Sequence, residues 1–317
     1  MSAQVPRSGN ASRLAWGDVP DAVVAAIGER AGSGVATATG AALGFSPGFA
    51  GVVGFEDGSR LFLKVISSDQ HPDSSTFNRR EAEVVAQLPE GLGVPRLQWE
   101  LDVDEWHVIA FEAIDGVPAS PAEDAEHERA AWDALTELAA VRAPAGLPQF
   151  NEHQSDVFTY WRELAAAPGL EARLVGYDTA WILAHLDDLI RWEAQAVEAT
   201  RGDRLVHGDF RADNLVIADG RAFVVDWPHA SAGAPWLDLA GFLPAHQMHG
   251  GAPAHEAFRA HPVGRDVPQE ELRAYVTSLA GYFVFHSTEP EPDHLPGLRA
   301  FQRAQALPSL RWLRELT

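Results

Sequence analysis

Three side chains with oxygen ligands stand close together in one stretch of the sequence. Asp209 and Asn214 are five residues apart, and Asp226 follows twelve residues later. Each borders a short apolar run, which would fix its position and make its desolvation costly without a bound cation. In a phosphoryl-transfer loop, one Asp orients a hydroxyl group while an Asn and a second Asp hold Mg²⁺. The spacing favours this chemistry over a polar loop in which the three residues only shape turns.

The segment His207-Gly208-Asp209, with Asn214 five residues on, resembles the HGDxxxxN signature of the aminoglycoside phosphotransferase family and related small-molecule kinases. Asp226-Trp227 is similar to the place where these enzymes carry Asp before an aromatic residue or Gly. The resemblance implies an α+β, bilobal protein-kinase-like fold, with an N-terminal antiparallel sheet plus helix and a mainly helical C-terminal lobe. It also implies transfer of the γ-phosphate of ATP (or GTP) to a hydroxyl of a small molecule.

The same resemblance assigns roles to single residues. Asp209 would accept the proton of the acceptor hydroxyl, and Asn214 and Asp226 would bind Mg²⁺. Arg211 stands where many relatives carry a basic residue, so we expect it to stabilise charge on the transferred phosphoryl group; a surface arginine is the alternative. Asp238 matches a family position that braces the catalytic loop, although a plain acid at a helix N-terminus would fit equally well.

Other elements must position these groups. The dipeptide Asp219-Gly220 closes a predicted β-hairpin between Asn214 and Asp226. Further upstream, Lys64 interrupts an apolar strand, where an unpaired ammonium would be costly. Glu81 is the only charge on the helical stripe that Phe77, Val84 and Leu88 define. We therefore expect a Lys64–Glu81 ion pair that positions the nucleotide phosphates, the alternative being a Glu81 that reaches solvent at the helix edge.

Segment 44–53 is a glycine-rich connection between strands. Successive N–H groups in such a turn can bind an anion, although a simple hairpin loop would have the same composition. Its position before Lys64 favours phosphate binding. By resemblance, the backbone at Phe111 and Ala113, in a strand expected over 106–113, would hydrogen-bond the adenine edge. The nucleotide contacts expected besides Lys64 and Glu81 are Gly44, Ser46, Gly48, Phe111 and Ala113.

A Gly/Pro break at 114–118 suggests a boundary between two lobes. We expect a nucleotide-binding lobe at 1–113, and a catalytic and acceptor-binding lobe at 114–317. In the first lobe Asp18 would cap a helix that ends at Gly32. Ser120 to Glu123 have the pattern of a capping box that opens the second lobe. Helices expected in that lobe are 121–142, 156–167, 179–200, 268–287 and 295–315.

Composition limits the partners. The formal net charge of −21 repels nucleic acid and anionic lipid, and a solvated acidic surface explains it better than attraction of a cationic substrate. The absence of cysteine excludes disulfides, thiolate metal sites and a cysteine nucleophile. No apolar run reaches membrane-spanning length and residues 1–16 lack a signal-peptide core, so we expect a cytoplasmic protein. No obligatory protein partner is evident. Four histidines should lie on a loop near the acceptor, with a metal site disfavoured: His246, His249, His255 and His261.

Three functions compete. A protein kinase would carry an Arg where Gly208 stands and a long segment after Asp226, and neither is present. A nucleotide-binding pseudokinase should have lost a catalytic group, and none is missing. A small-molecule kinase remains, with an acceptor that the sequence does not identify. Because the chain does not end in a run of acids, we favour a neutral or weakly cationic metabolite or sugar over an aminoglycoside or other antibiotic.

Overall fold

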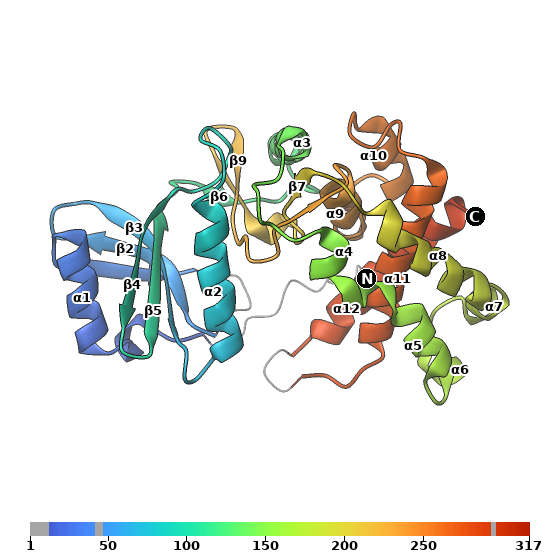
Figure 1. Ribbon diagram of the computed structural model, residues 1–317, viewed down its shortest axis with the longest axis horizontal. Helices are drawn as coiled ribbons and strands as arrows, with labels where there is room; N and C mark the ends of the chain where they lie inside the picture. The colour runs from blue at the N-terminus through green and yellow to red at the C-terminus, as the bar shows by residue number, and fades with distance from the viewer. Residues whose placement is uncertain (1–12, 42–46, 293–295) are drawn as a thin grey trace. The chain divides into compact units, whose positions relative to one another are not determined.

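The computed structural model describes residues 13–41, 47–292 and 296–317 (Figure 1). Antiparallel strands dominate the first part of the chain and helices dominate the rest, which confirms the predicted α+β class. Over the described ranges, every helix is too short or too polar to span a bilayer.

The described residues form two compact units. The sheet unit comprises 13–119 together with 213–228, and the helical unit comprises 120–212 and 229–317. The sheet unit therefore takes in the hairpin between Asn214 and Asp226 from late in the sequence. The functional division at 113/114 stays a prediction.

A five-stranded antiparallel sheet forms the centre of the sheet unit, in the order β1-β2-β3-β5-β4. Its apolar β-branched and aromatic residues suit a sheet that is covered on both faces. Figure 1 shows helices α1 and α2 on opposite sides of this sheet. These elements are α1 Asp21–Ala31, β1 Val35–Gly40, β2 Phe49–Phe55, β3 Arg60–Ser67, α2 Pro72–Val85, β4 Leu97–Val103 and β5 Trp106–Glu112.

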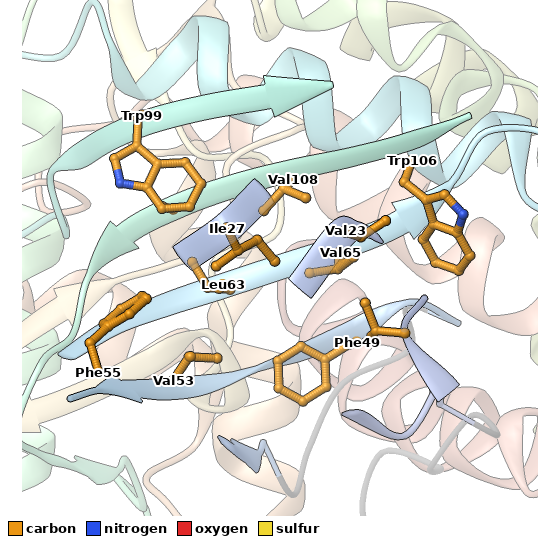
Figure 2. Packing of buried hydrophobic residues seen from close by; sticks show 12 residues of the cluster. Val23, Ile27, Phe49, Val53, Phe55, Leu63, Val65, Trp99, Trp106 and Val108 are labelled. Atoms are coloured by element: carbon orange, nitrogen blue, oxygen red, sulfur yellow. The ribbon is translucent and has the colours of Figure 1, made fainter. Parts of the chain in front are cut away.

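Alternate residues of β3 face opposite sides of the sheet, so the residues that pack in the core and the charged residue Lys64 lie on different faces. Leu63 and Val65 point into a core that Val23 and Ile27 of α1 complete (Figure 2). Lys64 lies between them in sequence and points to the other face, where α2 lies. The alternation thus places Lys64 on the face that α2 covers, apart from the apolar core on the other face.

A second, three-stranded sheet of the sheet unit has the order β6-β8-β9. It consists of β6 Val117–Pro118, β8 Leu215–Ala218 and β9 Arg221–Val224. The predicted hairpin turn is confirmed: Asp219 and Gly220 both have positive φ, 50° and 73°, as the two-residue turn requires.

The helical unit is built around long helices, with α11 packed against α12, α8 and α5. A short antiparallel pair joins β7 Arg204–Val206 to β10 Ser231–Gly233. The helices of this unit are α3 Ala125–Ala140, α4 Phe150–His153, α5 Tyr160–Ala166, α6 Leu170–Arg173, α7 Thr179–Ala184, α8 Leu186–Ala199, α9 Leu237–Met248, α10 Ala254–Ala260, α11 Gln269–Ser287 and α12 Leu298–Glu315.

Several predicted helix starts were wrong. The expected capping box at Ser120 forms only a turn, and α3 starts after Asp124, whose carboxylate accepts the N–H groups of Glu126 and His127. Asp18 ends a 3₁₀ turn, Trp16–Asp18, and Pro20 takes the N-cap position of α1. Several neighbouring Ser and Asp side chains could make the capping hydrogen bond, and Pro20 takes an N-cap position without one, so sequence alone does not choose the helix start.

The single helix expected over 179–200 is divided at His185. The ring of His185 stacks on Trp181, with 4.6 Å between ring centres, and its Nδ1 lies 2.8 Å from the Trp181 carbonyl oxygen. The histidines expected on a loop were also misplaced in part. His246 is buried in α9, with Nε2 3.1 Å from a carboxylate oxygen of Glu128.

A buried carboxylate fixes the start of α5. Glu193 of α8 is fully buried, and its two oxygens accept the N–H of Trp161 at 3.0 and 3.2 Å. Burial raises the pKa of Glu193 from 4.5 to about 7, although these backbone hydrogen bonds oppose the rise. The folded chain thus holds a proton on Glu193 in a pH range where the unfolded chain has released it.

We expect this group to make stability fall as pH rises from about 5 to 8. In that window the folded chain binds more protons at Glu193 than the unfolded chain, so raising the pH favours unfolding, by about 3 kcal/mol in total. Glu193→Gln should remove this contribution and flatten the slope. Unfolding measured at several pH values for both proteins is the check, and parallel pH curves would refute it.

Candidate active site

Lys64 is held between two carboxylates of the sheet unit. Its Nζ lies 2.5 Å from Glu81 Oε2 on α2 and 2.8 Å from Asp226 Oδ1 after β9. The predicted Lys64–Glu81 pair is therefore confirmed, and Asp226 is a second partner that the sequence did not indicate. Burial alone would lower the pKa of Lys64, but the charges of Asp226 and Glu81 raise it above its ordinary value. The ammonium stays protonated.

The β8–β9 hairpin places Asn214 and Asp226 at one end. The N–H of Val225 donates to the backbone oxygen of Asn214 at 2.9 Å, which brings the residue before Asp226 against Asn214. Asn214 is buried, whereas the Asp226 side chain is 47% exposed. Carboxylate and amide oxygens are the ligands that Mg²⁺ takes in proteins, so this pair fits the ion.

Asp226 also has an unusual backbone. Its φ of 70° lies in the left-handed region, where an L-residue is strained by about 1 kcal/mol. The conformation turns the carboxylate from the end of β9 toward Lys64.

In the helical unit, hydrogen bonds from other residues to the backbone of loop 207–211 fix its position. The carboxylate of Asp238, at the start of α9, accepts the N–H groups of His207 at 2.7 Å and Gly208 at 2.9 Å. The predicted bracing contact is thus present. Burial raises the pKa of Asp238 to about 6, against the effect of these two hydrogen bonds. Gln154 adds a bond from its side-chain amide to the Gly208 carbonyl oxygen at 3.2 Å, which no sequence pattern had indicated.

Gly208 cannot carry a side chain. It has a φ of 81°, and a Cβ there would lie 2.6 Å from the carbonyl oxygen of His229. This close approach explains why glycine precedes Asp209 in the chain.

Asp209 and Arg211 lie beside each other at the end of this loop. The Arg211 Nη1 is 3.7 Å from Asp209 Oδ1, and its guanidinium lies 5.5 Å from the ring centre of Phe301 on α12. Both side chains are partly buried, 22% exposed for Arg211 and 35% for Asp209. Arg211 is therefore not a solvated surface arginine, and its role in phosphoryl transfer stays a prediction.

The remaining nucleotide contacts are less constrained. Gly44 and Ser46 lie outside the described residues. Gly48 is buried, and a Cβ there would lie 2.5 Å from the Val65 carbonyl oxygen, so packing already accounts for this glycine. Phe111 is paired within β5, and Ala113 follows the end of that strand. Their contact with adenine stays a prediction.

A family model described as the phosphotransferase enzyme family matches residues 50–275, which includes every site residue described above from Lys64 to Asp238. The chain belongs to this family. The family consists of phosphotransferase enzymes.

Solved structures of small-molecule kinases share the fold. Choline kinase LicA from Streptococcus pneumoniae superposes with a TM-score of 0.55 at 14% identity, over 92% of this chain and 98% of that chain. The aminoglycoside phosphotransferase APH(3'')-Id from Streptomyces rimosus, in complex with ADP and streptomycin, gives 0.53 at 17% identity, over 82% and 98%. These similarities confirm the predicted protein-kinase-like fold.

One curated protein matches over a shorter stretch. Acyl-CoA dehydrogenase family member 10 from Mus musculus is 30% identical over 100 residues, which are 30% of this chain. The match spans only 9% of the length of that mouse protein.

The Asp238 brace predicts a stability defect. Asp238→Ala leaves the buried N–H of His207 and the partly buried N–H of Gly208 without their acceptor, which should cost about 3 kcal/mol of unfolding free energy and lower turnover. Denaturant unfolding checks this, with Asp187→Ala as the control because Asp187 is an exposed acid in the first turn of α8. Equal losses in the two variants would contradict the brace.

Lys64 is the only lysine in the sequence, so its reactivity can be measured selectively. Glu81→Gln removes one of the carboxylates that raise the pKa of Lys64, and acylation by an amine-reactive reagent should become about tenfold faster or more. Peptide mass spectrometry gives the rate, and the α-amino group of the same chain is an internal control. An unchanged Lys64 rate would show that Glu81 does not hold the ammonium.

Proposed function

We propose that the chain transfers the γ-phosphate of ATP or GTP to a hydroxyl group of a small molecule, with Mg²⁺. The observation that carries this proposal is the Lys64 ammonium fixed between Glu81 and Asp226. The ADP-bound relative supports use of a nucleotide. A cytoplasmic location, without nucleic acid, membrane or an obligatory protein as partner, is part of the same proposal.

The sheet unit would bind the nucleotide. Lys64 and the N–H groups of the glycine-rich connection would hold the phosphates, and the backbones of Phe111 and Ala113 would hold the adenine edge. Asn214 and Asp226 would hold Mg²⁺, which supplies positive charge to the phosphate oxygens when bound. The phosphate contacts proposed in the connection are Gly44, Ser46 and Gly48.

The helical unit would supply the base. Asp209 would orient the acceptor hydroxyl and take its proton, because Asp238 and Gln154 fix the backbone that carries it. Arg211 would stabilise negative charge on the transferred group. Asp238 touches only the loop and acts by positioning it.

The acceptor would be neutral or weakly cationic. An aromatic cluster of the helical unit packs Tyr160, Tyr282 and His286 together, with ring centres 4.6 to 5.7 Å apart. Burial and the charge of Asp209 raise the pKa of Tyr282, so its hydroxyl lies in the field of the proposed base. Arg211 acts on Tyr282 in the opposite direction, and such mixed charge suits a polyol or amino alcohol better than a polyamine.

An aminoglycoside remains the second candidate, because one relative of this fold holds streptomycin. That acceptor would need more carboxylates to neutralise its ammonium groups than the mixed charge around Tyr282 provides.

Nucleotide turnover with a panel of sugars, amino alcohols, hydroxylated metabolites and aminoglycosides tests the proposal. We expect activity with one of the first three classes, and a loss of about 100-fold or more in kcat in Asp209→Asn with nucleotide affinity unchanged. Strong activity on several aminoglycosides would overturn the acceptor preference. Nucleotide binding without turnover of any acceptor would favour a pseudokinase, and full activity of Asp209→Asn would remove the proposed base.

A further inference from the structure

The segment that precedes α1 contacts Ala41, before the glycine-rich connection, and Pro47, within it. The Arg13 Nη1 donates to the carbonyl oxygen of Ala41 at 3.1 Å, and the Leu14 N–H donates to that of Pro47 at 2.9 Å. Arg13 and Leu14 also line a cavity of about 260 Å³ together with Pro47 and Gly48, and its other lining residues are Asp18, Ser67, Gln70, His71 and Trp106. A segment remote in sequence from the family signature thus contacts the glycine-rich connection at Pro47 and the residue Ala41 that precedes it.

The Arg13 guanidinium shares a carboxylate field with Lys64. Burial lowers the pKa of Arg13, and the charge of Asp226 opposes this effect. Arg13 remains a cation, because arginine does not lose its proton in proteins. Asp226 therefore acts on two cations of the sheet unit, Lys64 by direct contact at 2.8 Å and Arg13 through space.

Lys64 alone is a weak phosphate ligand in this arrangement. An ammonium has three donors, and two of them already point to Glu81 and Asp226. The charges of Lys64, Glu81 and Asp226 sum to −1, while a nucleotide triphosphate is itself strongly anionic. The whole chain carries −21, so the long-range field also opposes the nucleotide. A further cation from the protein would add to the positive charge that Mg²⁺ supplies and would make the site more attractive to the nucleotide.

We propose that Arg13 binds the phosphate chain of the nucleotide together with Lys64. The planar guanidinium suits phosphate because it can donate two parallel hydrogen bonds, which an ammonium cannot. Its bond to Ala41 and the neighbouring bond of Leu14 to Pro47 hold it at the connection. This inference rests on the proposed function and adds to it a phosphate ligand from outside the signature.

Nucleotide affinities measured by titration calorimetry with Mg²⁺ test the inference. Arg13→Ala should weaken binding of ATP about tenfold or more while leaving adenosine within about twofold, because only ATP presents phosphate oxygens. Arg13→Lys should recover part of the ATP affinity, since it keeps the charge and loses the fork. The control is Arg30→Ala, an exposed arginine near the end of α1 that lies over Trp99.

Three outcomes would overturn the inference. An unchanged ATP affinity in Arg13→Ala would remove Arg13 from the phosphate site. If Arg13→Ala lost the same factor in affinity for ATP and for adenosine, and Arg13→Lys lost as much as Arg13→Ala, then Arg13 would only shape the connection. Failure of the unmodified chain to bind any nucleotide would overturn the proposed function as well. Thermal unfolding of the ligand-free variants identifies a variant that is misfolded. If Arg13→Ala is misfolded, the ATP and adenosine affinities of Arg13→Lys decide the test.

Discussion

The buried ammonium of Lys64 is the constraint on which the sheet unit depends. A charge that is only 14% exposed is costly unless opposite charges accompany it, and the two carboxylates come from different elements. Strand β3, helix α2 and the segment after β9 must therefore meet at one point. This requirement explains why residues 213–228 belong to the sheet unit although in sequence they lie between the two segments of the helical unit.

The helical unit also contains buried charged groups, but these are carboxylates. There, buried carboxylates are paired with backbone N–H groups instead of with cations. Asp238 holds the loop that carries Asp209, and Glu193 holds the start of α5. In both cases burial raises the pKa, to about 6 and about 7, because two or three hydrogen bonds offset only part of the lost hydration. Acidic residues thus organise the backbone here.

The sequence identified the chemistry better than the boundaries of the elements. Lys64 and Glu81 could be predicted because each is a charge on an otherwise apolar face, an arrangement with few alternatives. The contact of Lys64 with Asp226 could not be predicted from spacing, since 162 residues separate the two and only the tertiary fold brings them together.

Local hydrogen bonding caused two of the remaining errors. Asp124 competes with Ser120 for the start of α3, and His185 bonds to the Trp181 carbonyl and divides a continuous apolar pattern. Phe77 was placed on the buried stripe of α2, yet its side chain is 43% exposed. The helix ends at Val85, so the stripe that predicted Glu81 is shorter than the one the sequence suggested. Cap choice and helix length depend on small energy differences that periodicity does not resolve.

The left-handed backbone of Asp226 links backbone strain to the burial of the lysine. Glycine would occupy a φ of 70° without strain. Glycine would also remove one of the two carboxylates that hold the buried Lys64 ammonium. The two effects on stability oppose each other, so position 226 cannot be relaxed by itself, and an inactive version of this fold would have to change Lys64 and Asp226 together.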